Sequence, residues 1–397
     1  MFLNFARQSI AIGKLYPNMA MINADYIVSP IYVNYNILLL KFFNSPFIIL
    51  YFNIVLNIIQ LFLIYRITNK LFGERNAFIA SMIYMLYLTN LGIVLSNLTE
   101  LLFGVLIFTS ISFYLSNEKT LRYFLCGIFA GCALGVRPIA YAVILAYLFI
   151  YLYQVYKKQN PEHKKMACIL SGVFIIIILM GSISKKNIGY FIYTAGTGPL
   201  NLIQSSNDAA TGVYNDSIFK YDPVLKSKIT FKEKNDYLFN KSTVWIKQHP
   251  LKFISTIPKK IYTIFISDDW VVSQLAYTNQ WDFNKYIKSF KNPLLKAQFK
   301  NNFIGFKIFF ICINFFHQLF YISLMVLFIF QFIYFIKNKI LNKNIILLYM
   351  IIIIAYGLTF IVTIGTQRYK YPIFLVSFIL IAPVVNHLCQ KVFKKSL

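Results

Sequence analysis

Long apolar blocks, from which almost all charge is missing, constrain this chain more than any other feature. Hydrophobic residues make up 58% of the 397 residues and charged residues only 13%, whereas soluble domains are about 45–50% apolar and about 25% charged. Stretches that could cross a bilayer, or nearly so, lie at 46–66, 76–95, 98–115, 121–136, 138–155, 166–183, 308–336, 344–364 and 371–388. The blocks predict an all-α polytopic membrane protein with about nine transmembrane helices.

The same pattern divides the chain into four parts. Residues 1–45 are expected to form outer interfacial or re-entrant helices, because the apolar stretch 26–43 is interrupted by Pro30 and two asparagines. Residues 46–183 are expected to hold six spans, and 184–302 to form a large extracytoplasmic loop. Residues 303–397 hold three further spans and a cytoplasmic tail.

Lysine and arginine placement gives the orientation. The loops between spans fall alternately on the two sides of the membrane. Fifteen of these basic residues lie in or beside the loops 67–75, 116–120, 156–165 and 337–343 and the C-terminus. Only six lie in the short loops of the other side and the N-terminal segment. Cytoplasmic loops carry the excess of positive charge. The C-terminus is therefore expected inside and the N-terminus outside, in a multi-pass protein of the cell (plasma or inner) membrane. The net charge of +26 suits anionic lipid headgroups, and we expect no nucleic-acid partner.

On this topology the unusual polar residues gather on the outer face. Glu100 is the only acidic residue in an apolar stretch, and Arg137 lies in GVRPIAY at an outer turn. Arg368, Tyr369 and Lys370 lie in GTQRYKYP, before the last span. An ionised side chain within a span costs about 2.5–3.5 kcal/mol, so it usually has a partner or a function.

These residue types suit the phosphate of a lipid-linked sugar. Arginine presents a planar fork of donors that matches phosphate, and lysine adds a point charge. A nearby carboxylate could activate an acceptor hydroxyl or bind a divalent cation.

Each residue also has a simpler interpretation. Arg137 and Arg368 could reach the outer headgroups, and Glu100 could merely begin a helix capped by Thr99. His317, in the middle of a span, is better explained by a hydrogen bond to a neighbouring helix than by a role as a ligand.

Four segments in order resemble one known group of enzymes. They are SPIYVNYNILLLKFF with LFGERNAFIASMIYMLYL, TELLFGVLIFTSISFYL with LRYFLCGIFAGCALGVRPIAY, GPLNLIQSSNDAATGVY with VWIKQHPLKFISTIPKKIYTIF, and TQRYKYPIFLVSFILIA. Together they resemble the C-type (GT-C) polyprenyl-phosphate-sugar-dependent glycosyltransferases, near the protein O-mannosyltransferases and lipid A aminoarabinose transferases of family 39.

The resemblance implies an inverting transfer from a polyprenyl-phosphate sugar to a glycan, lipid or protein hydroxyl, with the active site outside the cytoplasm. It implies lipid-phosphate binding by Arg137, Arg368, Tyr369 and Lys370, and a donor loop containing Asn201, Asn207 and Gly212. The family's first span and catalytic acid are expected at or before Met1, so the chain is expected to be N-terminally truncated. Asp25 and Glu100 are the remaining candidates for an acidic catalytic role.

Two other functions stay open. A cell-envelope polysaccharide polymerase would also be polytopic with outer arginines, but would not be expected to carry these segments in this order. A flippase or transporter for lipid-linked sugars should show internal repeats with broken helices, and the sequence shows no clear repeat.

Overall fold

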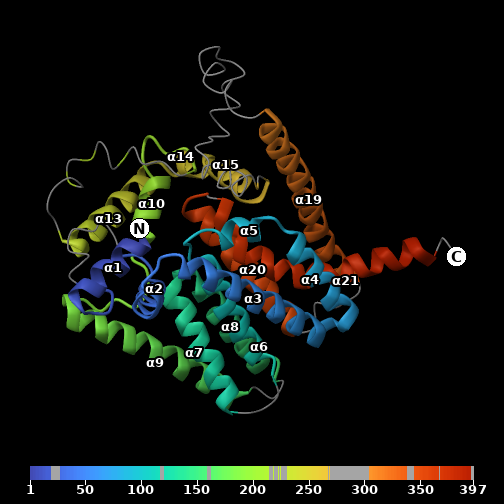
Figure 1. Ribbon diagram of the computed structural model, residues 1–397, viewed down its shortest axis with the longest axis horizontal. Helices are drawn as coiled ribbons and strands as arrows, with labels where there is room; N and C mark the ends of the chain where they lie inside the picture. The colour runs from blue at the N-terminus through green and yellow to red at the C-terminus, as the bar shows by residue number, and fades with distance from the viewer. Residues whose placement is uncertain are drawn as a thin grey trace.

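The computed structural model of the protein is mainly helical in its described parts (Figure 1). It describes residues 1–18, 27–116, 120–158, 162–213, 218, 222, 224, 230–266, 268, 304–337, 344–365 and 367–394. Asp25 lies outside these residues, and so does the side chain of Arg368. The described residues form no β-strand and one isolated parallel bridge, between Val213 and Gly365.

The nine apolar stretches of the sequence all contain helices. Their bounds are α3 Ile48–Phe72, α4 Glu74–Leu86, α6 Glu100–Tyr114, α7 Thr120–Val136, α8 Tyr141–Tyr156, α9 His163–Ile188, α19 Ile304–Lys337, α20 Asn344–Val362 and α21 Tyr371–Lys394. The stretch 76–95, predicted as a single span, is instead broken at the extended residue Tyr87 into α4 and a short helix, α5 (Thr89–Val94).

Five of the described helical segments are long and apolar enough to cross a membrane: Ile48–Phe72, Pro138–Tyr156, His163–Ile188, Ile311–Phe335 and Phe374–Lys391. Three shorter apolar helices, Glu100–Tyr114, Thr120–Val136 and Leu347–Val362, accompany them. The predicted class, an all-α polytopic membrane protein, is confirmed.

The N-terminal segment forms two helices, α1 (Phe2–Ile12) and α2 (Pro30–Phe43). Ser29 caps α2 by accepting a hydrogen bond from the Tyr32 amide, and Pro30 occupies the first helical turn, where its missing N–H is no loss. The two helices pack through a small apolar cluster that includes Ala6, Tyr16 and Val33.

Close helix packing in the bundle depends on small residues. A Cβ atom added at Gly127 of α7 would lie 2.0 Å from the Ile169 carbonyl oxygen of α9, and one at Gly172 would lie 2.4 Å from the Phe124 carbonyl oxygen. Glycine lets two backbones approach in this way, which favours helix association in a membrane.

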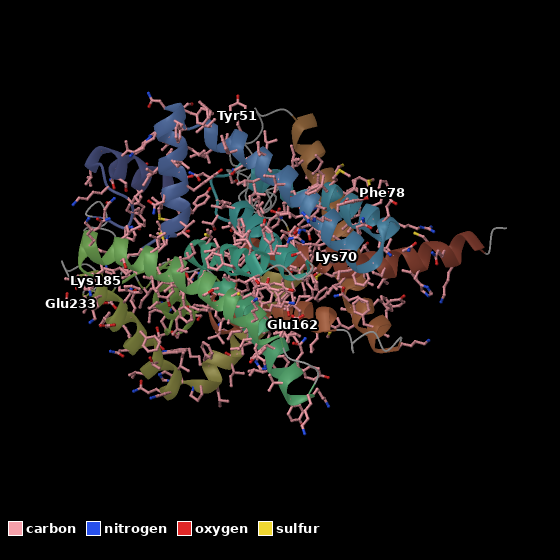
Figure 2. The ribbon with its side chains drawn as sticks, turned by 90° about the horizontal axis from the view of Figure 1, so that it is seen from below. Tyr51, Lys70, Phe78, Glu162, Lys185 and Glu233 are labelled. Atoms are coloured by element: carbon pink, nitrogen blue, oxygen red, sulfur yellow. The ribbon has the colours of Figure 1, made fainter. Side chains whose placement is uncertain are left out.

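Helices α6 and α7 are antiparallel, since the Ser110 hydroxyl donates to the Cys126 carbonyl close to their connection. The bundle therefore has two ends. We call the end where α6 begins and α7 ends the site end, and the end where α3 and α6 finish the far end. Figure 2 shows Lys185 and Glu233 at one side of the molecule and Lys70 and Glu162 well away from them.

Further helices follow α9. They are α10 (Gly198–Ser205), α13 (Phe231–Gln248), α14 (Pro250–Ser255), α15 (Ile257–Ile261) and a π-helical turn, η3 (Tyr262–Ile266). Figure 1 shows α10 and α13–α15 gathered along one side of the bundle, near the N-terminus. A capping box between Thr230 and Glu233 begins α13.

Candidate active site

The Arg-Pro sequence fixes where α7 ends and presents Arg137. The residue before a proline is driven out of the helical region, and Arg137 is extended, with φ −146° and ψ 132°. The Leu134 and Gly135 carbonyls near the end of α7 accept hydrogen bonds from the hydroxyls of Thr194 and Ser29. Two residues from distant parts of the chain thus satisfy carbonyl groups at the end of α7, beside Arg137.

Glu100 begins α6 at the same end of the bundle. Its Oε1 lies 3.3 Å from Nη1 of Arg137, and the Glu100 side chain is 1% exposed whereas that of Arg137 is 15% exposed. Glu100 also accepts a hydrogen bond from the hydroxyl of Thr99. The buried carboxylate is therefore paired with the guanidinium, while the Arg137 side chain remains partly exposed.

Tyr369 holds Arg137 from another side. It belongs to the 3₁₀ turn η5 (Gln367–Lys370), immediately before α21. The guanidinium carbon of Arg137 lies 5.0 Å from the centre of the Tyr369 ring, which stacks on Phe360 of α20 at 5.2 Å. A guanidinium over an aromatic face is stabilised by a cation–π interaction. The outer turn predicted from GTQRYKYP thus meets the Arg-Pro turn.

Buried polar atoms of α2 and α20 accompany this pair. The Tyr32 hydroxyl donates to Asn97 Oδ1 at 2.6 Å, and the Asn36 amide donates to the same oxygen at 3.4 Å. The hydroxyls of Tyr35 and Tyr356 are buried and have no hydrogen-bond partner in the part of the chain that the structure describes. Buried polar atoms normally have partners, so these two hydroxyls are available to a bound polar ligand.

A second buried cluster centres on Asp268. Its Oδ1 lies 3.1 Å from Nζ of Lys370, and its Oδ2 lies 3.0 Å from Nε2 of His317. The Thr89 hydroxyl donates to Oδ2 at 2.8 Å. Burial alone would raise the pKa of the Asp268 carboxyl, but Lys370, His317 and Thr89 together hold it below its ordinary value.

The geometry around His317 is not that of a nucleophilic relay. A relay requires the carboxylate on one ring nitrogen and the nucleophile on the other, whereas Asp268 and Thr89 both approach Nε2. The Nδ1 atom of His317 has no partner among the described residues. The cluster is better explained as a buried polar contact that connects α5, α19, η5 and the segment before α19.

The predicted lipid-phosphate residues therefore lie in two settings. Arg137 and Tyr369 are in contact and partly accessible. Lys370 is 1% exposed and paired with Asp268, so its role toward a lipid phosphate stays a prediction. The structure describes only the backbone of Arg368, in η5.

The predicted donor-loop residues lie on and after α10. Asn201 is on the helix, and Asn207 closes its end: the Asn207 amide donates to the Ile203 carbonyl, and its Oδ1 accepts from the Ala209 amide. Gly212 has a φ of +82°, and its carbonyl accepts a hydrogen bond from the Gly365 amide at 3.1 Å. The loop is thus tied to the connection between α20 and η5.

Two residues of the Asp268 cluster went unnoticed in the sequence. Asp268 lies in the long polar loop, where neither periodicity nor spacing distinguishes one acid from another, and Thr89 lies inside the apolar stretch 76–95, where nothing in the pattern marks it. Among the described residues, no group of three or more His, Cys, Asp or Glu side chains could hold a metal ion. We therefore assign no residues to the divalent cation that the sequence leaves open.

Comparison with known families bears on the segment that carries Glu100 and Arg137. Residues 30–183 match the model of the dolichyl-phosphate-mannose-protein mannosyltransferase family. The predicted resemblance is confirmed over this segment, which is less than half of the chain. The match supports a membrane glycosyltransferase of the C type. Asn201, Asn207, Gly212 and η5 lie outside it. No curated protein and no solved structure matches the chain.

Proposed function

We propose that the protein transfers a sugar from a polyprenyl-phosphate donor to an acceptor hydroxyl at the site end of the bundle, on the extracytoplasmic face. The glycosyltransferase class rests on the family match over residues 30–183. The outer placement rests on the lysine and arginine distribution, because the turns at Arg137 and η5 belong to the loops that are poor in positive charge.

One observation carries the proposal: the Arg137 guanidinium is held by two neighbours, and the Arg137 side chain is still partly exposed. Glu100 holds the guanidinium by an ion pair at 3.3 Å, and the Tyr369 ring supports it at 5.0 Å. A bidentate match to phosphate needs a planar fork in a defined orientation. Because the Arg137 side chain remains 15% exposed, it can meet a phosphate whose lipid tail stays in the bilayer.

The reaction follows from this placement. The acceptor oxygen attacks the anomeric carbon, and the bond from that carbon to the phosphate oxygen breaks on the opposite face, so the configuration inverts. The bonding electrons leave with the polyprenyl phosphate, whose new negative charge Arg137 stabilises. Donors preorganised at a developing anion are typically worth roughly 10²–10³-fold in rate each.

The acceptor proton requires a separate base. Glu100 already shares its charge with Arg137, and we assign it to holding the guanidinium. Asp25 stays the candidate base that the sequence offers. The unpartnered hydroxyls of Tyr35 and Tyr356 are suited to hydrogen bonds with sugar hydroxyls.

A transfer assay tests the proposal. Purified protein in lipid nanodiscs would be given a polyprenyl-phosphate sugar carrying a labelled sugar, with membrane extract as acceptor source. We expect labelled acceptor and released polyprenyl phosphate, and a fall of roughly 10²–10³-fold for Arg137→Ala. Arg75→Ala is the matched control, since Arg75 is exposed in the first turn of α4, away from the site.

The two alternatives give different results in the same experiment. A polymerase would lengthen lipid-linked oligosaccharides and leave single-sugar donors unused. A flippase would move the labelled donor across a sealed bilayer without releasing polyprenyl phosphate. Either result would replace the proposal, as would full transfer by the Arg137→Ala protein.

A further inference from the structure

A small cavity of about 30 Å³ opens between α3 and α6 at the far end of the bundle. It is lined by Arg66, Ile67, Lys70, Ser112, Leu115 and Ser116. The rise of an α-helix places Tyr114, the last residue of α6, about 21 Å from Glu100, and Ser116 follows two residues later. The cavity is therefore separate from the candidate active site, although both use α6.

Three of the four positive charges around this cavity have no carboxylate partner among the described residues. Arg66, Lys70 and Arg122 make no ion pair with a carboxylate in the part of the chain that the structure describes. The fourth cation, Lys165, is paired with Glu162 at 2.7 Å. Arg66, Arg122 and Lys165 all lie close enough to act electrostatically on Lys70. Like charges that no described carboxylate neutralises favour an anion between them.

The neutral lining groups suit phosphate in particular. The Ser112 hydroxyl has no hydrogen-bond partner among the described residues, so it is free to donate into the cavity. The Ser116 hydroxyl donates to the Phe113 carbonyl at 2.7 Å. A guanidinium, an ammonium and a free hydroxyl form a donor set that matches phosphate oxygens.

The surface beside the cavity indicates that the phosphate belongs to a lipid. Phe62, Arg66 and Lys70 are spaced four residues apart and therefore share one face of α3. Phe62 is 58% exposed on a helix that is long and apolar enough to span a membrane. An acyl chain could lie along Phe62 while its headgroup reaches Arg66. Basic pockets between the cytoplasmic ends of membrane helices commonly bind anionic headgroups.

We propose that the cavity between α3 and α6 binds the phosphate of an anionic membrane lipid. This site is independent of the proposed transfer reaction, and its test reads lipid binding alone. Free inorganic phosphate offers the same chemistry, so the experiment must separate the two sources.

The experiment measures binding of phosphatidylglycerol to the protein in phosphatidylcholine nanodiscs, by fluorescence from a labelled lipid. We compare the wild type with the double variant Arg66→Gln/Lys70→Gln. The matched control is Lys185→Gln/Lys186→Gln, which removes two exposed charges from the last turn of α9, at the opposite end of the bundle. Because the first variant removes two charge-assisted contacts, we expect about tenfold weaker binding or more, and we expect unchanged binding in the control.

If both double variants lost lipid affinity equally, the proposal would be overturned, because lipid binding would then depend only on the net charge of the protein. Displacement of the labelled lipid by millimolar inorganic phosphate would overturn the assignment to a lipid. If Arg66→Gln/Lys70→Gln does not fold, Ser112→Ala provides the milder test, and unchanged binding by that folded variant would also count against the site.

Discussion

Glu100 and Arg137, which are 37 positions apart in the sequence, form an ion pair at 3.3 Å between the start of α6 and the end of α7. The pair is asymmetric, since the Glu100 side chain is buried and the Arg137 side chain is partly exposed. This asymmetry suits a group that must receive an anion from the membrane while remaining fixed in orientation.

Glu100→Gln tests whether the carboxylate holds Arg137 in place. The substitution keeps the shape but removes a charge-assisted interaction of about 1.5–3 kcal/mol. We expect turnover in the transfer assay to fall by about 10- to 100-fold, with normal insertion and folding. Glu233→Gln, at an exposed capping box, serves as the control. Unchanged turnover by Glu100→Gln would mean that Glu100 only begins α6.

The Asp268–Lys370 ion pair is expected to stabilise the fold and not to bind the donor. Removing one partner of a buried ion pair costs about 3–5 kcal/mol, because the other charge stays buried and unpaired. We expect Asp268→Asn and Lys370→Met each to lower the unfolding temperature in detergent, and the double variant to lose less than the sum. If Lys370 instead binds the donor phosphate, Lys370→Met would raise the KM for donor at an unchanged unfolding temperature.

Lys260 gives the protein a pH dependence. Its ammonium donates to the carbonyls of Ile361 and Val362 at the end of α20, and burial lowers its pKa from 10.5 to about 8. The unfolded chain therefore binds more protons than the folded protein between pH 8 and 10.5, so the contribution of Lys260 to stability rises across that window. We expect the unfolding temperature of the wild type, relative to Lys260→Met, to increase from pH 8 to pH 10. A flat difference would contradict the lowered pKa.

Gly212 is required by the backbone of the predicted donor loop. Its φ is +82°, and an added Cβ would lie 2.8 Å from the Thr256 carbonyl oxygen. We expect Gly212→Ala to cost about 1–3 kcal/mol of local stability and to increase proteolysis of the loop. Gly198→Ala is the control, because its Cβ would meet no atom within 4 Å. Equal protease resistance in both variants would show that the loop tolerates the strain.

The sequence predicted the helices well because bilayer-length apolar runs leave few alternatives. The Arg-Pro dipeptide predicted an outer turn, and Arg137 indeed follows the last residue of α7. Orientation by charge placed Glu100, Arg137 and Tyr369 on one face, and the structure brings these three together.

Pairwise contacts could not be predicted in this way. Whether Glu100 meets Arg137 depends on how α6 and α7 pack, and hydropathy carries no information on helix rotation. The partner of His317 was expected on a neighbouring helix, and the structure gives two partners, Thr89 on α5 and Asp268. The role of Asp268 could not be predicted from the sequence, since only the folded chain brings it beside Lys370.

The most direct test of the central claim is the affinity of the protein for polyprenyl phosphate, measured in nanodiscs for the wild type and for Arg137→Ala. Polyprenol, which lacks the phosphate, is the matched ligand. We predict that Arg137→Ala weakens polyprenyl phosphate binding by about 10- to 100-fold and leaves polyprenol binding unchanged. Equal affinity of the two proteins for polyprenyl phosphate would contradict the assignment of Arg137 to the leaving phosphate.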